Sequence, residues 1–293
     1  MDLFSISQLQ QFSGIKSHTI RIWEQRYNAL QPNRSEGNTR YYSNQQLKRL
    51  LNIVSLMGNE YKISELCSMT DEVLAKIING HFKKKSSPYL AIEYSASQLI
   101  AAGMDLDEKY FDKVFSKCVS RYGIKNTYVK VISPMLARIG LMWTTGEMPP
   151  AQEHFISNLI RQKLFAAIDS LPSPKSLKNG WLLFLPENEF HEIGLLFSNY
   201  LIRSSGASVF YLGANTPLDT LANVAKDISP SHMLFFLVHN DDPKDVQHYL
   251  NILTAKFKKT KMYISGNENL ITQLSIGRLF TWIRSVEELE ERL

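Results

Sequence analysis

The sequence Trp181-Leu182-Leu183-Phe184-Leu185, closely followed by Glu189-Phe190-His191-Glu192-Ile193-Gly194, is the most informative part of this chain. The apolar run is typical of a buried strand, so His191 lies where a strand ends and a helix begins. Ligands usually bind at this edge of an open α/β sheet. An imidazole there can donate one ring nitrogen to a transition metal, while Glu189 accepts the other ring N–H and fixes the tautomer. Gly194 leaves room for a ligand to pass close to the backbone.

The residues around this stretch, from about 178 to 293, alternate between strand-like and helical pieces. The strand-like pieces are 181–185, 208–212, 233–238 and 262–265, and the helical pieces between them are 191–203, 218–225 and 245–256. Such alternation predicts a parallel sheet with crossover helices.

Upstream, residues 88–172 show helical periodicity. Apolar stripes run along 89–102, 106–122, 127–143 and 151–168, and four helices with short connections predict a bundle. The stretch Lys83-Lys84-Lys85-Ser86-Ser87-Pro88 cannot bury anything and is interpreted as a linker. We therefore expect three domains, over residues 1–80, 88–172 and 178–293.

The first 80 residues carry the basic character of the chain. Residues 1–50 hold seven Lys and Arg against three Asp and Glu, in a chain with a formal net charge of +5. A short amphipathic piece over 5–15 ends at a glycine, and a second helix follows from Ser17 with Ile20 and Trp23 on its inner face. The Arg-, Asn- and Tyr-rich piece 32–42 then indicates a wing. The pattern predicts a helix-turn-helix that binds a polyanion.

Composition indicates the class of protein and its location in the cell. Hydrophobic residues make up 44% and charged residues 21% of the chain, which is typical of a globular protein. No apolar stretch approaches the roughly 20 residues that a membrane helix needs, so we expect no membrane partner. The start of the chain is unlike a secretory signal, and Cys67 and Cys118 lack metal-type spacing. These observations favour a cytoplasmic protein.

The N-terminal motifs resemble the winged-helix DNA-binding domain of MerR-type regulators. The resemblance rests on Thr19-Ile20-Arg21-x-Trp23-Glu24-x-Arg26-Tyr27, the loop at Arg34, and Arg40-Tyr41-Tyr42. It implies that the second helix enters the major groove of double-stranded operator DNA and that the wing grips the backbone. The implied DNA contacts are Ser17, His18, Thr19, Arg21, Arg34, Arg40 and Tyr41. The alternative is a solvated basic surface on a small helical domain.

A second constellation is Trp143 followed after nine residues by Glu153-His154. An indole can cover a flat hydrophobic ligand, and a buried Glu–His pair can hold polar groups against it. A tryptophan that ends a core helix is more often simply part of the core. His191, a histidine in the first turn of an expected helix, would likewise more often be a structural hydrogen-bonding group than a ligand.

Taken together, the two constellations resemble the light-responsive, cobalamin-binding repressors called CarH or LitR. The resemblance spans the chain and implies a winged helix-turn-helix, a four-helix bundle and a Rossmann-like (flavodoxin-like) cobalamin domain. It implies that His191 is the lower axial ligand of cobalt, with Glu189 as the motif's acidic residue and Gly194 beside the nucleotide tail. Ser265-Gly266 stands where the family usually has two glycines lining that tail. Trp143, Glu153 and His154 are implied to cover the upper face, where the adenosyl group packs.

The resemblance also implies the activity. We expect a regulator, most simply a repressor, that senses adenosylcobalamin or another cobalamin, and light through it, by assembling as a homodimer or homotetramer. Thr144 stands where related proteins have a histidine that can capture cobalt after photolysis, and a hydroxyl is a poor substitute for imidazole at cobalt. Two alternatives stay open: a MerR-type regulator that works without cobalamin, and a corrinoid protein of the methyltransferase type. Nothing in the sequence supplies a catalytic set, so no enzyme is expected.

Overall fold

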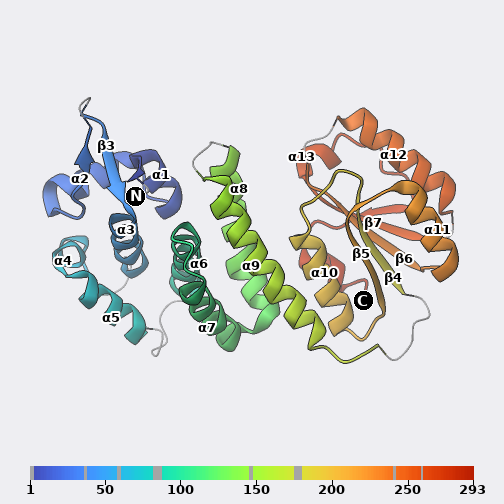
Figure 1. The fold of residues 1–293 in the computed structure, drawn as a ribbon, viewed down its shortest axis with the longest axis horizontal. Helices are drawn as coiled ribbons and strands as arrows, with labels where there is room; N and C mark the ends of the chain where they lie inside the picture. The colour runs from blue at the N-terminus through green and yellow to red at the C-terminus, as the bar shows by residue number, and fades with distance from the viewer. Residues whose placement is uncertain are drawn as a thin grey trace. The chain divides into compact units, whose positions relative to one another are not determined.

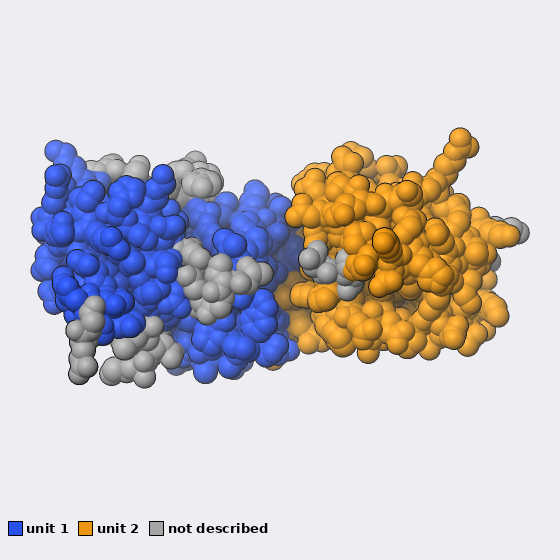
Figure 2. Space-filling view, turned by 90° about the horizontal axis from the view of Figure 1, so that it is seen from above, with its two compact units in different colours: residues 1–159 blue, residues 160–293 orange. Residues whose placement is uncertain are grey.

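The computed structural model describes residues 3–35, 38–57, 61–81, 88–144, 148–174, 180–239, 242–258 and 260–293. The chain divides into two compact units, residues 1–159 and 160–293, shown in blue and orange in Figure 2. Figure 1 labels the helices and strands of both units. The boundary between the units falls within one helix, α9 (Pro150–Asp169).

The first part of unit 1 is a winged helix-turn-helix. Helix α1 (Ile6–Ser13) begins at a capping box made by Ser5 and Gln8 and ends at Gly14, which has φ +72°. Helix α2 (Ser17–Tyr27) follows, and β2 (Asn33–Arg34) and β3 (Arg40–Ser43) form the wing. With β1 (Leu3–Phe4), these strands make an antiparallel sheet in the order β1-β3-β2. As predicted, Ile20 and Trp23 are the buried residues of α2.

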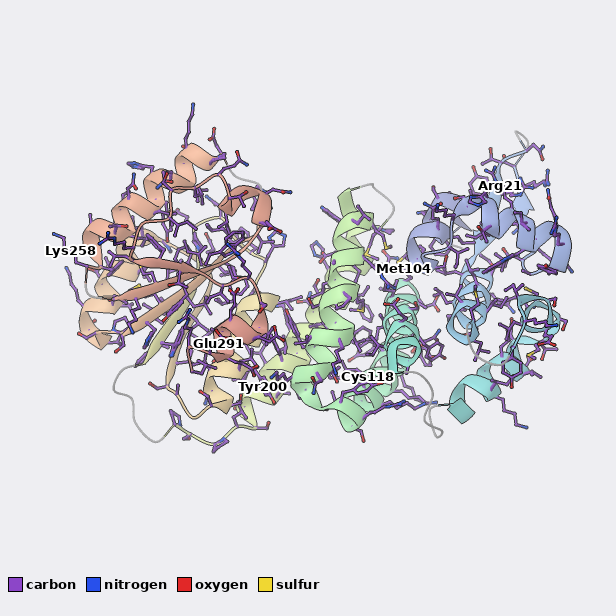
Figure 3. The ribbon with its side chains drawn as sticks, turned by 180° about the vertical axis from the view of Figure 1, so that it is seen from behind. Arg21, Met104, Cys118, Tyr200, Lys258 and Glu291 are labelled. Carbon is purple, nitrogen blue, oxygen red and sulfur yellow. The ribbon has the colours of Figure 1, made fainter. Side chains whose placement is uncertain are left out.

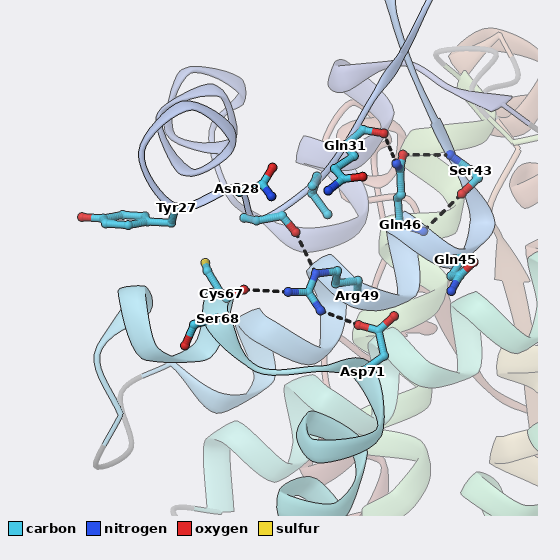
Figure 4. Close-up of a pocket in the computed structure, with 12 residues that line it drawn as sticks. Tyr27, Asn28, Gln31, Ser43, Gln45, Gln46, Arg49, Cys67, Ser68 and Asp71 are labelled. Atoms are coloured by element: carbon cyan, nitrogen blue, oxygen red, sulfur yellow. Dashed lines mark hydrogen bonds and ion pairs between the residues drawn. The ribbon is translucent and has the colours of Figure 1, made fainter.

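Three further helices support this motif, and the sequence analysis did not foresee them: α3 (Asn44–Leu56), α4 (Ile63–Ser68) and α5 (Asp71–His81). Arg49 on α3 joins them to the end of α2 (Figure 4). Its guanidinium donates to the carbonyl oxygens of Ala29 (2.8 Å) and Cys67 (2.7 Å) and to the carboxylate of Asp71 (2.6 Å). Arg49 also lines a pocket of about 620 Å³. Its guanidinium N–H groups already donate to acceptors within the fold.

The second part of unit 1 is helical, as expected. It contains α6 (Pro88–Met104), α7 (Glu108–Thr127), the π-helix η1 (Tyr128–Ile132), α8 (Ser133–Thr144) and the start of α9. Gly123, with φ +75°, interrupts α7 where the sequence predicts a break between two helices. Cys118 is buried on α7 (Figure 3). The expected linker 83–88 lies outside the described residues except for Pro88, which begins α6, and the division into three domains stays a prediction.

Within unit 1 the winged helix-turn-helix packs on the helical part. Helices α3 and α6 pack against each other. The side-chain amide of Gln98 donates to Asn52 (3.3 Å), the Tyr110 hydroxyl donates to Gln98 (2.6 Å), and Lys48 forms an ion pair with Asp105. Gln98 is buried. Polar side chains therefore set the register of the two helices, because a buried amide loses free energy unless its partners are in place.

Unit 2 is a parallel sheet covered by helices on both faces. Its strands are β4 (Trp181–Pro186), β5 (Val209–Thr216), β6 (His232–Leu237), β7 (Lys261–Gly266) and β8 (Phe280–Trp282), in the order β5-β4-β6-β7-β8. All neighbouring strands are parallel. The order reverses at β4, so the crevice at the C-terminal ends of β4 and β6 is the switch point at which such folds bind ligands.

In the described part of unit 2, four helices connect successive strands of the sheet, and a fifth follows the last strand. They are α10 (Ile193–Ser204), α11 (Leu218–Ile228), α12 (Pro243–Lys256), α13 (Glu268–Ile271) and α14 (Val286–Glu290). Residues of α11, α12 and α13 share one core with Leu182 and Phe184 of β4, while α10 contacts β4, β5 and β6. Every residue of β4 is buried, as expected for a strand covered on both faces.

The predicted fold class is confirmed: a helix-turn-helix motif, a helical region and a Rossmann-like parallel sheet occur in that order. The sequence analysis missed β8, α13 and α14, which are too short to carry a clear periodic pattern. Among the described residues, no helix has both the length and the hydrophobicity needed to cross a bilayer.

Candidate functional site

His191 lies in the loop between β4 and α10, and the carboxylate of Glu189 holds its ring. The Nδ1 atom of His191 is 2.6 Å from Oε1 of Glu189, which also accepts the backbone N–H groups of Phe190 (2.9 Å) and His191 (3.0 Å). The hydrogen bond predicted between these two side chains is therefore present. With Nδ1 as the donor, the lone pair of the neutral ring is on Nε2, the nitrogen that can bind a metal.

The second oxygen of Glu189 reaches the neighbouring strand. Its Oε2 accepts the backbone N–H groups of Val238 (2.8 Å) and His239 (2.7 Å), which directly follow β6. A single carboxylate thus joins the ends of β4 and β6 at the switch point of the sheet. The side chain of Glu189 is 4% exposed, whereas that of His191 is 60% exposed. The supporting carboxylate is buried, and the imidazole that it holds is accessible to solvent.

The charge of Glu189 is stabilised by these contacts. Burial raises the pKa of its carboxyl group, but the hydrogen bonds from the His191 ring and from backbone N–H groups outweigh burial and lower the pKa to about 2. The carboxylate is therefore ionised at neutral pH and keeps the N–H of the imidazole on Nδ1. This arrangement orients the imidazole so that Nε2 is the nitrogen that could bind a metal.

Gly194 and Gly266, predicted to lie beside the nucleotide tail, are each required by local packing or backbone geometry. A Cβ on Gly194 would lie 2.8 Å from the ring of Phe236, so this glycine lets α10 pack against β6. Gly266 has φ +130°, and a Cβ there would lie 2.2 Å from the carbonyl oxygen of Leu237. Ser265 is half-buried in β7. The backbone geometry alone therefore requires glycine at 266, whether or not a ligand passes it.

The other predicted cofactor residues lie in unit 1. Trp143, near the end of α8, is 46% exposed, so it is not the core residue that a helix-ending tryptophan more often is. Oε2 of Glu153 is 2.9 Å from Nδ1 of His154, and Glu153 also accepts the hydroxyl of Ser157 (2.5 Å). The sequence analysis expected a buried pair, but the side chain of His154 is 71% exposed. His154 lies near the start of α9, where its ring extends into solvent.

The predicted site thus falls into two sets. Glu189, His191, Gly194, Ser265 and Gly266 belong to unit 2, and the indole and the second Glu–His pair belong to unit 1. The side chain of Thr144 lies outside the described part of the chain.

Sequence reasoning missed Glu192, which follows the histidine directly. Its carboxylate is buried and binds the Arg161 guanidinium (2.6 Å) and the Tyr211 hydroxyl (2.8 Å). The available signal was a second acid beside the motif, but the partners lie at distant positions in the chain, so no local pattern could identify them.

The predicted DNA-binding residues of α2 differ in how free they are. His18 and Arg21 are exposed, and Thr19 is half-buried (Arg21 is labelled in Figure 3). Ser17 is engaged within the fold, because its N–H and its hydroxyl both contact Oε1 of Gln10, at 2.7 and 3.0 Å. Ser17 therefore joins α1 to α2.

The wing brings two predicted arginines together. Arg34 and Arg40 are directly paired across β2 and β3, so their side chains start from the same face. Arg34 contacts Asn38, and Nε of Arg40 donates to Glu24 on α2 at 3.1 Å. Tyr41 is half-buried opposite Asn33. Glu24, whose side chain is 6% exposed, is a residue that the sequence analysis quoted but gave no role: it ties the wing to the helix.

Comparisons with known proteins agree with this architecture. Residues 4–72 match the family model described as MerR HTH family regulatory protein, and residues 96–167, which span α6 to α9, match the model of a B12 binding domain. The chain is 24% identical to the HTH-type transcriptional repressor CarH of Myxococcus xanthus, over 99% of this chain and 97% of that protein. It is 26% identical to the repressor CarA of the same organism, over 97% of this chain and 94% of that protein.

A solved structure shares the fold of about two thirds of this chain. The monomethylamine corrinoid protein of Methanosarcina barkeri aligns with a TM-score of 0.52 at 12% identity, covering 66% of this chain and 94% of that one. At this identity the likeness shows the fold alone. The relatives CarH and CarA, which align over nearly the whole length of this chain, are both named as transcriptional repressors.

Proposed function

We propose that this chain, a CarH-like regulator with a MerR-type DNA-binding domain and a B12-binding domain, holds adenosylcobalamin through His191 and uses it to control its assembly on operator DNA. The observation that carries the proposal is the Glu189–His191 pair at the switch point of the sheet. Acting on operator DNA, such a regulator works in the cytoplasm.

The residues present fit a corrin. Among the described residues, no group of three or more His, Cys, Asp or Glu side chains could enclose a metal ion. A lone, oriented imidazole suits a metal that brings its equatorial ligands with it, and His191 is exposed enough to approach a planar macrocycle. His191 would hold cobalt from below, with Gly194, Ser265 and Gly266 beside the nucleotide tail.

By the same proposal, Trp143, Glu153 and His154 would pack on the adenosyl group of the cofactor. Trp143 is 46% and Leu141 is 59% exposed on α8, an apolar surface of the kind that packs against a flat ligand. Glu153 and His154 offer an acceptor and a donor that can bind the hydroxyls and amino group of an adenosyl substituent.

The cofactor, when bound, supplies a weak and photolabile cobalt–carbon bond. The protein supplies the assembly. If unit 1 packs on the adenosyl group, a dimer or tetramer presents several winged helices to one operator, and effective concentration multiplies their affinity. His18, Thr19 and Arg21 would enter the groove, and Arg34, Arg40 and Tyr41 would contact phosphates, with Ser17 positioning α2.

The test is to purify the protein in darkness with adenosylcobalamin and to record its absorbance and its elution volume before and after green light. We expect a bound cofactor and an oligomer that becomes smaller on illumination. A bound cofactor with an unchanged size would support ligand sensing and reject photoswitching. A chain that elutes without cofactor would instead support the alternative, a regulator that works without cobalamin.

A further inference from the structure

The carboxylate of Glu192, next to His191, is held from two directions. Its Oε2 is 2.6 Å from a terminal nitrogen of the Arg161 guanidinium, and its Oε1 accepts the Tyr211 hydroxyl at 2.8 Å. The side chain of Glu192 is 8% exposed, and that of Arg161 is 41% exposed. The ion pair is therefore shielded on the carboxylate side and reaches solvent on the arginine side.

Strand β5 is shaped to receive this carboxylate. Gly213 has φ +79°, and a Cβ there would lie 3.0 Å from Oε1 of Glu192, so any other residue would crowd the carboxylate. Burial raises the pKa of the Tyr211 hydroxyl, and its hydrogen bond to Glu192 raises that pKa further. The phenol thus stays protonated and serves as a permanent donor. A bulge in the pairing of β4 and β5 falls beside these residues.

The ion pair connects two elements that matter for the proposed function. Glu192 is the N-cap residue of α10 and follows the cobalt-binding histidine in the same loop. Arg161 is on α9, and the same helix carries Glu153 and His154 about two turns earlier. One charged contact therefore joins the loop of the lower ligand to the helix of the predicted upper face.

Stability alone does not explain this pair. Desolvation of a buried carboxylate offsets most of the attraction in such pairs, and apolar replacements often stabilise a protein as well or better. What this ion pair does provide is a defined geometry, because the buried Glu192 carboxylate is strongly unfavourable without a partner. The arrangement thus favours one position of α9 relative to the His191 loop.

We propose that Arg161 and Glu192 are positioning residues that transmit the state of the His191 loop to α9. The inference rests on the proposed function and names the route by which the cofactor site controls assembly. A movement of His191 shifts Glu192, and the guanidinium carries that shift to a helix that supplies part of the upper face. Tyr211 and Gly213 hold the fixed side of the contact.

The test uses the full chain and four variants: Arg161→Gln, Glu192→Gln, the double variant of both, and Arg161→Lys. Arg138→Gln is the matched control, since Arg138 forms an ion pair with Glu93 in the helical part of unit 1. Each protein is loaded with adenosylcobalamin in darkness. The readouts are the absorbance spectrum, the retained cofactor, and the change in elution volume between the protein with and without adenosylcobalamin.

We expect the single Gln variants to retain cofactor within about threefold of wild type, with an unchanged spectrum, because His191 and Glu189 are intact. Their cofactor-dependent change in size should fall by more than half. Arg161→Lys keeps the charge and should restore part of it, and Arg138→Gln should respond as wild type does. If a single variant fails to fold, the double variant, which leaves no unpaired charge, provides the same comparison.

Variants that keep the full size response would overturn the inference while leaving the proposed function in place. A loss of cofactor or an altered spectrum in Glu192→Gln would also overturn it, since Glu192 would then act on His191 itself. A wild-type chain that binds no cobalamin would overturn the proposed function and this inference with it.

Discussion

The pairs Glu189–His191 and Glu153–His154 both place a carboxylate oxygen against Nδ1 of a histidine, at 2.6 and 2.9 Å. Their surroundings differ. Glu189 is buried and accepts four backbone N–H groups in addition to the ring, two from its own loop and two from the end of β6. Glu153 is partly exposed and is supported by one hydroxyl on its own helix, that of Ser157.

This difference teaches how one chemical pair can serve two purposes. A histidine whose partner is fixed by backbone groups from two strands is oriented before a ligand arrives, so binding costs little reorganisation. A pair on an exposed helix turn can change its conformation at little cost. We infer that the first pair determines whether cofactor is held, and that the second adapts to the group on its upper face.

We expect the largest difference between the two pairs when each histidine is replaced by alanine. His191→Ala should lower the affinity for adenosylcobalamin by more than about 100-fold, because a first ligand contributes more than its supporting residues. His154→Ala should lower it by less than about tenfold, since that ring is largely exposed. Titration followed by absorbance measures both. Equal losses in the two variants would contradict the division of roles.

The supporting carboxylates give the next largest difference. Glu189→Gln should lower cofactor affinity by about 10–100-fold, because the tautomer of His191 is no longer fixed. It should also lower the free energy of unfolding by about 1–3 kcal/mol, since buried N–H groups lose an acceptor. Glu153→Gln should change the free energy of unfolding by less than about 0.5 kcal/mol. Urea unfolding of the cofactor-free proteins checks this, and similar values for both variants would argue against a preformed site.

The contrast between held and free side chains extends to the DNA-binding motif. Arg21 is exposed, whereas Arg40 is held by Glu24. Arg21→Ala should weaken binding to a duplex that the wild-type protein selects from a random library by about 1–3 kcal/mol, with an unchanged melting temperature. Arg40→Ala should lower both the affinity and the melting temperature. Binding is compared at one fixed salt concentration, and an unchanged affinity of Arg21→Ala would remove it from the groove.

A third histidine sharpens the comparison with the smallest expected effect. The His232 ring is stacked on Trp181, with centroids 4.6 Å apart, and burial together with Lys261 lowers its pKa below 6.5. The folded state therefore binds fewer protons than the unfolded state just below this pH, so stability should decrease as the pH falls through 6.5. His232→Phe should lose this part of the decrease. The urea midpoints of both proteins at pH 7.5 and pH 5.5 measure this decrease. An equal change of midpoint between the two pH values in both proteins would exclude His232 as the cause.

Much of the architecture could be predicted because it depends on local sequence patterns. The apolar run before Glu189, the inner face of α2 and the break near Gly123 are all set by neighbouring residues along the chain. The hydrogen bond between the His191 ring and the Glu189 carboxylate belongs to the same class, since the two residues are two positions apart. The short elements β8, α13 and α14 had no such signal, because they depend on contacts with the rest of the sheet.

The sequence by itself therefore determined the order of folded elements and the identity of the histidine, because periodicity and close spacing act over a few residues. Only the tertiary structure decided what holds that histidine and what it is joined to. The second oxygen of Glu189 meets residues some 50 positions away, and Glu192 finds Arg161 and Tyr211 on other elements. Chain folding alone brings such groups together, since no local preference links residues that far apart.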